Sequence, residues 1–313
     1  MKDYKTYNCT LENFKECLEE YGVCVIPDVF YSEECVALRN DIWSDLETLH
    51  KNRFQLADNK TWHHFYDMFP LHAMLIQHFS IAHMQSVWNI RQDPRIGHIF
   101  ETLWGTDKLL SSFDGISINL PPEDTNRGWY LGNDWMHTDQ SPIKKGLHCI
   151  QGLVNLYPVN DGDATLTILE SSHKYHEEFF DTIDYHENND WFRLQEGHRE
   201  FFEEKGCHQY CVKAPIGSVV LWDSRTFHQG IEAQKDRENK NFRMVVYTCL
   251  IPRDRFSEKD LATKKKAFEE RRVTNHWGTK MFPKMPRTYG RSVPDFEPVS
   301  EPELSEYGKT LLF

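Results

Sequence analysis

The sequence predicts a mainly β fold with flanking helices, whose core is a two-sheet jelly roll, also called a double-stranded β-helix. Three observations lead to this prediction. Short apolar segments separated by turn residues follow one another from about residue 113. Helix-like patterns come mainly before them, and helices and strands do not alternate regularly. Regular alternation is typical of a parallel α/β sheet, whereas many short strands between turns are typical of a jelly roll.

A chain of 313 residues is long enough to form one domain with a large core. We predict a single domain over residues 1–313. It has a helical part at about 1–110, a jelly-roll core at about 111–252 and an extended tail at 253–313. The tail prediction depends on its prolines, which are Pro283, Pro286, Pro294, Pro298 and Pro302.

The beginning of the chain predicts a helix, a strand and a longer helix. Residues 11–20 have a helical pattern, and residues 22–27 form a short apolar segment closed by proline. Apolar residues then recur at helical spacing, which predicts a helix from about 33 to 50. Ser32 is the expected N-cap of that helix, because its hydroxyl can accept a hydrogen bond from the first turn.

Residues 53–92 contain many aromatic residues and histidines but show no clear period. Half-buried packing is the ordinary explanation for such a segment, and a pocket wall or lid is the alternative. A further helix is expected after it, because Asp93-Pro94 is a typical helix start. Gly105 follows Trp104 and is expected to end that helix.

The second half of the chain predicts the strands of the jelly roll. A proline pair stops the first of these strands, and the strand that carries His137 and Asp139 comes next. Residues 173–205 are charged and aromatic, and we expect them to form helix and loop inserted between strands. The other expected strands are 113–120, 147–158, 165–169, 210–213, 218–222 and 242–251.

Composition excludes several classes of protein. Lys and Arg total 36 against 48 Asp and Glu, a formal charge of −12, which argues against sequence-independent binding to nucleic acid. No apolar run reaches the roughly 18 residues of a membrane-spanning helix. The N-terminus has no apolar segment typical of a secretion signal. The eight cysteines lie in ordinary apolar contexts, so we expect an intracellular, cytoplasmic protein with reduced thiols.

The stretch Trp135-Met136-His137-Thr138-Asp139-Gln140 carries the strongest chemical signal. His137 and Asp139 are two residues apart, so on an extended strand both side chains point to the same face. His228, far along the chain, is the best candidate for a third ligand. Two histidines and one carboxylate leave three octahedral positions open, as in non-haem Fe(II) oxygenases. The ordinary alternative is a strand-surface His-x-Asp and an unrelated turn histidine.

These motifs resemble those of the phytanoyl-CoA dioxygenase family of Fe(II)/2-oxoglutarate-dependent oxygenases. The similar segments are spread over about residues 22–250, and His137-Thr138-Asp139 is similar to the family's metal-binding motif. Two positions depart from the family pattern. Glu170-Ser171 precedes Ser172-His173 where Pro-Gly is usual, and Gly230 stands where some members have serine. The remaining similar segments are 22–29, 162–173, 217–230 and 241–243.

The resemblance implies a cupin-like jelly roll that uses Fe(II), 2-oxoglutarate and O2. His137, Asp139 and His228 would bind the iron. Arg243 would pair with the far carboxylate of 2-oxoglutarate, because an arginine fork matches a carboxylate better than lysine does. Arg237 is the lesser candidate for that role. Gln151 is expected to hydrogen-bond the co-substrate, while Ser172 and His173 are expected to be structural.

The expected substrate is a small organic molecule, either a carboxylic acid or an amino-acid-like compound. Trp135, Arg127 and Lys145 are the candidate substrate contacts. The resemblance implies oxidation of an unactivated C–H bond with release of succinate and CO2, by hydroxylation, desaturation or oxidative ring closure. Halogenating members of the family lack the carboxylate that Asp139 supplies here. Relatives in natural-product pathways, including algal kainoid synthases, are similar in these motifs.

Three alternatives remain at this point. The chain could be a non-catalytic jelly-roll binding protein or a metal-dependent isomerase of cupin type, and neither would need Arg243. It could instead be a hydroxylase that modifies proteins, for which an open groove is expected in place of a closed pocket. A zinc or nucleotide site has little support, because the cysteine spacing is not finger-like and no glycine-rich phosphate loop is present.

Overall fold

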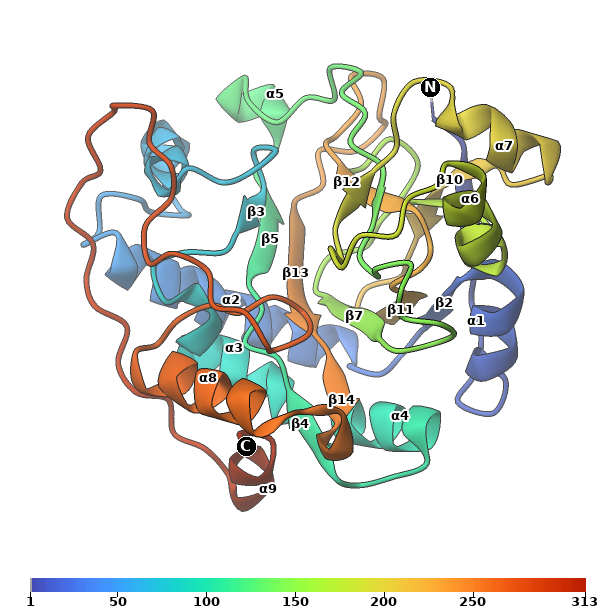
Figure 1. The fold of residues 1–313 in the computed structure, drawn as a ribbon. Coiled ribbons are helices and arrows are strands. Elements are labelled where there is room, and N and C mark those ends of the chain that lie inside the picture. Colours follow the sequence, from blue (N-terminus) through green and yellow to red (C-terminus); the bar gives the residue numbers. More distant parts are fainter. Residues whose placement is uncertain (1) are drawn as a thin grey trace.

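Two six-stranded sheets form the centre of the protein in a computed structural model that describes residues 2–313 (Figure 1). The first sheet has the order β1-β10-β8-β12-β6-β9, and the second has the order β2-β11-β7-β13-β5-β3. Neighbouring strands are antiparallel except β1 and β10. The two-sheet arrangement confirms the predicted jelly roll with flanking helices.

Each strand that the sequence predicts lies close to an observed strand, but several short strands, and the strand that carries His228, were not predicted. The expected strand 165–169 is β8, whereas the expected strand 242–251 is divided into β13 and β14. The first sheet consists of β1 (Tyr4–Thr6), β10 (Gln209–Lys213), β8 (Thr165–Leu169), β12 (His228–Ile231), β6 (His137–Thr138) and β9 (Phe192–Arg193). The second consists of β2 (Val23–Ile26), β11 (Val219–Asp223), β7 (Ile150–Asn155), β13 (Arg243–Thr248), β5 (Ile116–Asn119) and β3 (Leu75–Ile76). A separate pair joins β4 (Leu109–Ser111) to β14 (Leu250–Pro252).

Alternation along β13 shows how the second sheet divides the core. Met244 and Val246 belong to the large apolar cluster on the helix side of this sheet. Val245 belongs to the cluster between the two sheets, which also contains Leu166 and Ile168 of β8. Because side chains alternate along a strand, Arg243 faces the same side as Val245. Arg243 therefore faces the space between the two sheets, beside this apolar cluster.

Helices cover the outer face of the second sheet, as the sequence predicts. The longest is α2 (Ser32–Leu49), which is preceded by α1 (Phe14–Tyr21) and followed by α3 (Gln85–Arg91) and α4 (Pro94–Trp104). Asp93 accepts a hydrogen bond from the backbone N–H of Arg95 at 2.9 Å, and Gly105 ends α4 with φ 70°. These are the start and stop signals expected from the sequence.

The N-cap of α2 differs from the expectation by one residue. Tyr31, and not Ser32, is the N-cap. The shift places Glu34 three residues after the cap, where its carboxylate accepts a hydrogen bond from the Tyr31 backbone N–H at 2.7 Å. A capping-box bond of this kind satisfies one of the free donors at the start of a helix, which explains why the earlier residue is preferred.

The segment between α2 and α3 is held by short turns. It contains two 3-10 helices, η1 (Asn59–Met68) and η2 (Ile81–His83), and the short strand β3. His83 is fully buried and its Nε2 lies 3.0 Å from the carbonyl oxygen of Arg272. His72 instead stacks on Trp135, with ring centroids 4.0 Å apart. One histidine is thus a packing residue, and the other lies against the stretch that carries the metal-binding motif.

The insertion expected at 173–205 covers the outer face of the first sheet. It forms η3 (Ser172–Tyr175), α6 (His176–Thr182) and α7 (His198–Glu204), together with β9. Its aromatic residues Phe179, Phe180 and Phe202 pack on Met136 and Phe227 of the sheet. The pairing of β9 with β6 brings this insertion to the strand that carries His137.

The tail is not extended throughout, which corrects the prediction for residues 253–313. It contains η4 (Arg253–Arg255), α8 (Glu258–Glu269) and α9 (Glu306–Thr310). Ser257 and Asp260 form a capping box that starts α8, a signal present in the sequence. Lys264 on this helix is fully buried, with its ammonium 3.8 Å from the Phe113 ring centroid.

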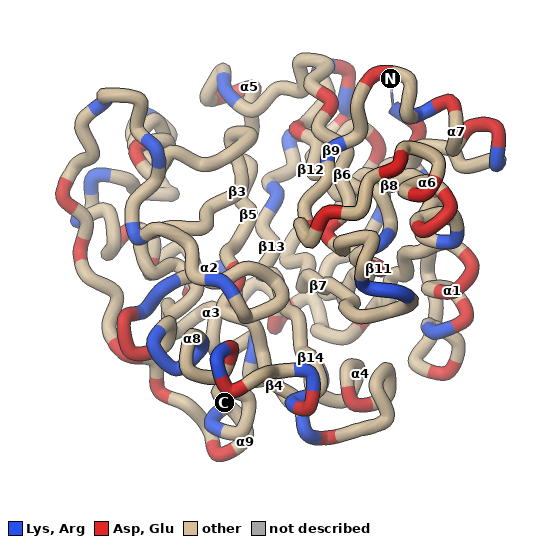
Figure 2. Tube along the Cα trace, in the orientation of Figure 1, with Lys and Arg blue, Asp and Glu red and all other residues tan. Residues whose placement is uncertain are grey.

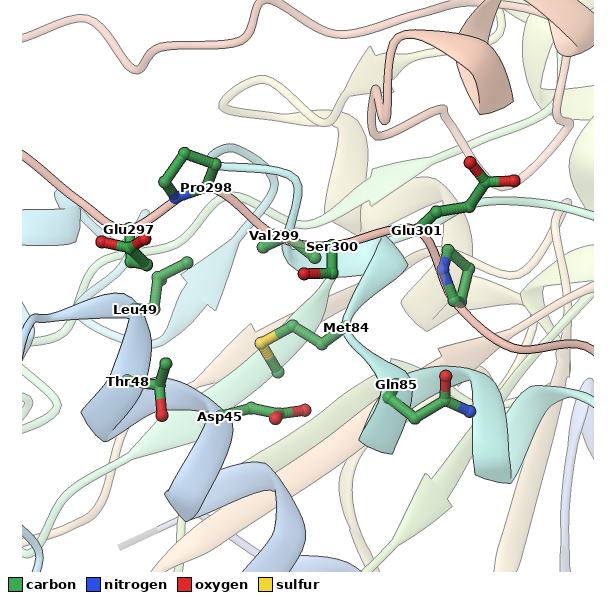
Figure 3. Close-up of a pocket in the computed structure, with 11 residues that line it drawn as sticks. Asp45, Thr48, Leu49, Met84, Gln85, Glu297, Pro298, Val299, Ser300 and Glu301 are labelled. Atoms are coloured by element: carbon green, nitrogen blue, oxygen red, sulfur yellow. The ribbon is translucent and has the colours of Figure 1, made fainter.

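Beyond α8 the tail lies along the side of the molecule that carries α2 and α8 (Figure 1). Where residues 297–302 cross α2, they line a half-open cavity of about 150 Å³ (Figure 3). Asp45 in its wall accepts hydrogen bonds from the backbone N–H and the hydroxyl of Ser86. None of the predicted site residues lines this cavity, so we assign it to packing of the tail.

Charges of both signs are interspersed along the chain (Figure 2). All eight cysteines are free thiols, and seven of them are buried. Among residues 2–313, the helices are too short or too polar to cross a membrane.

Candidate metal centre

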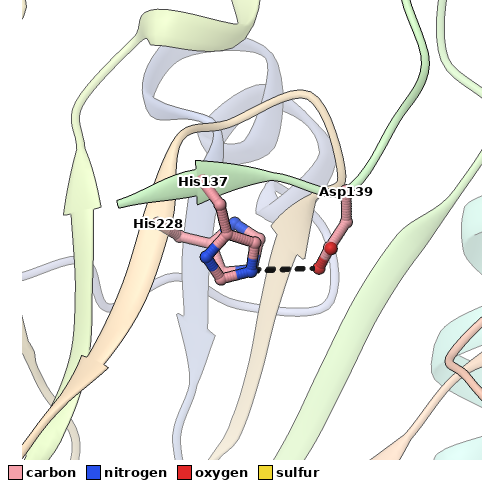
Figure 4. A group of neighbouring side chains, drawn as sticks. All are labelled: His137, Asp139 and His228. Carbon is pink, nitrogen blue, oxygen red and sulfur yellow. Dashed lines mark ion pairs between the residues drawn. The ribbon is translucent and has the colours of Figure 1, made fainter. Parts of the chain in front are cut away.

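The three predicted metal-binding side chains meet at the edge of the space between the sheets. His137 on β6 and His228 on β12 are direct cross-strand partners, and Asp139 follows β6 by one residue (Figure 4). The Nε2 atoms of His228 and His137 lie 3.3 Å and 3.6 Å from Asp139 Oδ2. One ligand atom from each residue lies within 4.8 Å of the others, so a single cation can contact all three.

Hydrogen bonds from neighbouring turns fix the strands that carry these residues. The carbonyl oxygen of Ser224 accepts from the Asp139 backbone N–H and from the Thr138 hydroxyl, both at 2.9 Å. Ser172 accepts from the Phe227 backbone N–H at 2.9 Å, next to His228. His173 lies 3.0 Å from the Glu19 carbonyl oxygen. Ser172 and His173 therefore have the structural roles expected of them.

Both histidines present the same nitrogen to the carboxylate. His137 Nδ1 lies 3.1 Å from the carbonyl oxygen of Trp135, and His228 Nδ1 lies 2.8 Å from that of Thr226. A carbonyl oxygen only accepts hydrogen bonds, so each Nδ1 carries a proton, and Nε2 is the ring nitrogen that faces the carboxylate. This is the usual support of histidines that bind a metal, and the donor set therefore fits a divalent cation.

Burial and charge favour the protonation states that bind a metal. His137, His228 and Asp139 are only 5 %, 4 % and 9 % exposed. Burial lowers the pKa of His137, although Asp139 partly opposes this shift. Burial alone would raise the pKa of Asp139, but His137 and His276 outweigh it and hold that pKa well below its ordinary value. A neutral imidazole and an ionised carboxylate are the forms that coordinate cations.

Gln151 contacts Asp139, one of the three predicted metal ligands, while its expected contact with the co-substrate stays a prediction. Its Nε2 donates to Asp139 Oδ2 at 3.0 Å and to the hydroxyl of Ser224 at 3.4 Å. The alternation along β7 directs Gln151 and Leu153 into the space between the sheets, where Asp139 lies. The amide nitrogen is therefore engaged by the carboxylate, and Gln151 orients Asp139.

Arg243 is a buried guanidinium without an acidic partner. It is 4 % exposed, and within the described part of the chain it donates only to the carbonyl oxygen of Ala164, at 3.3 Å, and leaves Nε unpaired. Among residues 2–313 it makes no ion pair. Ser117 Oγ and Asn119 Oδ1 on the adjacent strand β5 also have no hydrogen-bond partner among the residues that the structure describes. Burial lowers the pKa of Arg243 and the nearby Tyr247 opposes that shift, so an anion would be stabilised beside it.

Arg237, the lesser candidate, is already paired. It contacts Glu123 through two nitrogens at 2.8 Å and 2.6 Å, and it contacts Asp163 at 3.1 Å. Its side chain is only 1 % exposed. Because two carboxylates already satisfy this guanidinium, Arg237 is not available to bind a third anion. Arg243 is therefore the better candidate of the two.

The three predicted substrate contacts have different surroundings. Trp135 stacks on His137, with ring centroids 4.8 Å apart and planes 14° apart, so it lies beside the metal-binding group. Arg127 is exposed and lies over the ring of Tyr66. Lys145 is exposed and pairs with Glu177 at 3.4 Å. The structure thus places Trp135 beside His137, whereas Arg127 and Lys145 contact Tyr66 and Glu177, and their role as substrate contacts stays a prediction.

Three aromatic residues at the site were missed by the sequence analysis. The ring of Trp191 lies 5.8 Å from that of His137. His276 Nδ1 lies 3.9 Å from Asp139 Oδ2, and Trp277 donates from Nε1 to the Asp139 carbonyl oxygen at 3.1 Å. Trp191 lies in a long insertion and the other two in the tail. Their only signal is the presence of large aromatic residues in otherwise polar segments.

Comparisons with known proteins identify relatives of the chain. The family described as phytanoyl-CoA dioxygenase (PhyH) matches residues 18–237, which include His137, Asp139 and His228. Ava biosynthesis cluster protein O of Aspergillus versicolor is 33% identical over 270 residues, covering 80% of this chain and 84% of that protein. The family match includes the strands from β2 to β12 and ends before β13.

Solved structures provide a comparison of the fold. The hypothetical protein JW0805 from Escherichia coli is 14% identical with a TM-score of 0.63, covering 99% of this chain and 84% of that protein. This likeness shows that the two proteins share a fold, including the region of the tail. The carbocyclase SnoK from nogalamycin biosynthesis is 17% identical with a TM-score of 0.48, covering 78% of this chain and 86% of that protein.

Proposed function

The chain belongs to the phytanoyl-CoA dioxygenase family, and from this premise we propose that it is an Fe(II)/2-oxoglutarate-dependent oxygenase. The observation that carries the proposal is the approach of two Nε2 atoms to one oxygen of Asp139, at 3.3 Å and 3.6 Å. Two histidines and a carboxylate on one face match the ligand set of non-haem iron oxygenases and leave positions for a co-substrate and O2.

Each residue then has a distinct task. His137, Asp139 and His228 would hold Fe(II), which together with 2-oxoglutarate and O2 supplies the oxidising chemistry. Gln151 keeps the Asp139 carboxylate oriented through its 3.0 Å hydrogen bond. Arg243 would pair with the far carboxylate of 2-oxoglutarate, because its guanidinium is buried and has no acidic partner among the described residues.

The course of the strands supports this position for the co-substrate. Arg243 reaches across to Ala164, directly before Thr165, which pairs with Ile231 on β12. Ile231 is three residues from His228 on the same strand. The strand position next to Arg243 and the predicted metal ligand His228 are therefore separated by about 10 Å along β12. A short dicarboxylate can bridge a separation of this order. The distance along the strand therefore agrees with one co-substrate that contacts both ends.

We propose a small organic substrate, either a carboxylic acid or an amino-acid-like compound, oxidised at an unactivated C–H bond. The products would be succinate, CO2 and a hydroxylated, desaturated or ring-closed compound. Trp135 lies against His137 and would exclude water from the reacting group. The Aspergillus relative is named for a biosynthesis cluster, which supports a role in natural-product formation.

The test is binding of 2-oxoglutarate to the Fe(II)-loaded protein without oxygen. A keto acid that chelates Fe(II) gives a visible charge-transfer absorption, and we expect this absorption with the wild type. Asp139→Ala should abolish it, whereas Asp184→Ala, which removes a carboxylate that is 95 % exposed, should not. With oxygen admitted and a metabolite extract added, succinate should form. Absence of both the absorption and succinate in the wild type would favour a binding protein or an isomerase.

A further inference from the structure

A loop from the tail folds back onto the metal-binding group. Residues 273–282 form this loop, whose ends are joined by the bridge between Thr274 and Met281. Thr274 is fully buried and exchanges two hydrogen bonds with Phe113, one from its backbone N–H at 2.7 Å and one to its hydroxyl at 2.9 Å. The loop is therefore anchored to the segment that leads into β5.

Trp277 at the tip of the loop holds the backbone of Asp139. Its indole N–H donates to the Asp139 carbonyl oxygen at 3.1 Å, and the ring packs on Cys149 and Cys249. On its other side, the Lys144 ammonium lies 4.2 Å from the ring centroid. A tryptophan that is 9 % exposed and hydrogen-bonded in this way is a fixed part of the structure.

His276 faces the carboxylate of the same residue. Its Nδ1 lies 3.9 Å from Asp139 Oδ2, the oxygen that both metal-binding histidines also approach. His276 lies outside the group of three residues whose ligand atoms are within 4.8 Å of one another, so it stands beside that group. Its Nε2 is buried and has no hydrogen-bond partner among the described residues.

Asp139 needs this support because the sheet does not provide it. β6 ends at Thr138, so Asp139 lies beyond the ladder. Its backbone N–H is held by Ser224, and its carbonyl oxygen is held by Trp277. One of the two backbone anchors of this residue therefore comes from the tail. Side chains that orient a metal ligand in this way typically contribute 10- to 100-fold to metal affinity.

We propose that the 273–282 loop is part of the metal centre, with Trp277 and His276 as positioning residues that keep Asp139 in its metal-binding orientation. The proposal rests on the proposed function. It goes beyond the family match, which ends at residue 237 and so excludes the loop. The loop would thus belong to the binding site of the cation, in addition to its packing role.

The experiment measures Co(II) affinity by calorimetry in the full-length protein, with the visible Co(II) spectrum as a second readout. Trp277→Phe removes the indole N–H and keeps an aromatic ring. We expect Co(II) to bind about tenfold more weakly to this variant and its spectrum to change. Trp104→Phe is the matched control, because Trp104 also donates from Nε1 to a backbone carbonyl oxygen, that of Leu250 at 2.9 Å. This control should bind Co(II) as the wild type does.

A second pair of variants keeps the proposal testable if Trp277→Phe does not fold. His276→Phe removes the imidazole that faces Asp139, and His50→Phe removes another buried imidazole with unpaired nitrogens. Only the first should weaken Co(II) binding. If the wild type binds Co(II) and Asp139→Ala does not, but Trp277→Phe and His276→Phe both match the wild type within twofold, this inference is wrong. If the wild type binds no Co(II), the proposed function fails as well.

Discussion

His137 and His228 lie directly opposite each other on β6 and β12, with ring centroids 4.5 Å apart. The strands are paired through the sheet, so the register places the two imidazoles side by side without help from a cation. A slip of one residue would move one histidine to the other face of the sheet. The position of the two histidines is therefore a property of the protein scaffold.

Metal removal should leave the fold intact. Because the sheets already hold both histidines, EDTA is expected to abolish activity while the circular dichroism spectrum and the cooperative thermal transition remain. A divalent metal at about 100 times its Kd should add about 2.7 kcal/mol to the free energy of unfolding. Calorimetric scans with and without metal measure this difference, and Asp139→Ala should show none. Loss of the cooperative transition in EDTA would contradict the prediction.

Gln151→Met should weaken metal binding and leave 2-oxoglutarate binding to the metal-saturated protein unchanged. The substitution keeps the length of the side chain but removes the N–H that donates to Asp139 at 3.0 Å. We expect about a tenfold rise in the Kd for Co(II). Titrations with metal and with 2-oxoglutarate distinguish the two roles considered for this residue. A variant with normal metal affinity and weak 2-oxoglutarate binding would show that Gln151 binds the co-substrate and does not orient Asp139.

Arg243→Met should weaken 2-oxoglutarate binding, whereas Arg237→Met should lower the stability of the fold. Arg243 has no acidic partner among the described residues, so its replacement should weaken 2-oxoglutarate binding on the order of a hundredfold at little cost to stability. Arg237→Met leaves the carboxylates of Glu123 and Asp163 without their partner, and should destabilise the fold by about 3–5 kcal/mol. Urea unfolding and 2-oxoglutarate titration of both variants measure these effects. Equal 2-oxoglutarate binding by Arg243→Met and wild type would show that Arg243 does not bind the co-substrate.

The local spacing in the sequence was sufficient to predict that His137 and Asp139 share one face. The i, i+2 spacing of His137 and Asp139 depends only on strand geometry, and His228 stands in a second strand of the same fold. The helix that starts after Asp93 and ends at Gly105 was predictable for the same reason, because its caps are local. Such features are set by neighbours in sequence, and the structure agrees with them.

Features set by distant contacts were not predictable. Lys145 is close to Asp139 in sequence, but its side chain turns to Glu177 on another element. Lys264 lies in a run of three lysines that suggests a solvated face, yet α8 packs it against Phe113. His276 and Trp277 lie beside Asp139 in a loop whose Thr274 is hydrogen-bonded to the distant Phe113. No spacing within one segment carries this information.

Acid should destabilise the protein between about pH 6.5 and pH 4, and His50 should account for part of the loss. His50 is fully buried beside Phe54 and Phe296, its ring nitrogens have no partner, and burial lowers its pKa to about 4. Below about pH 6.5 the unfolded chain binds a proton that the folded chain excludes, so stability falls by up to about 1.4 kcal/mol per pH unit. His50→Phe should reduce this slope in urea unfolding measured at several pH values. An unchanged slope would contradict the assignment.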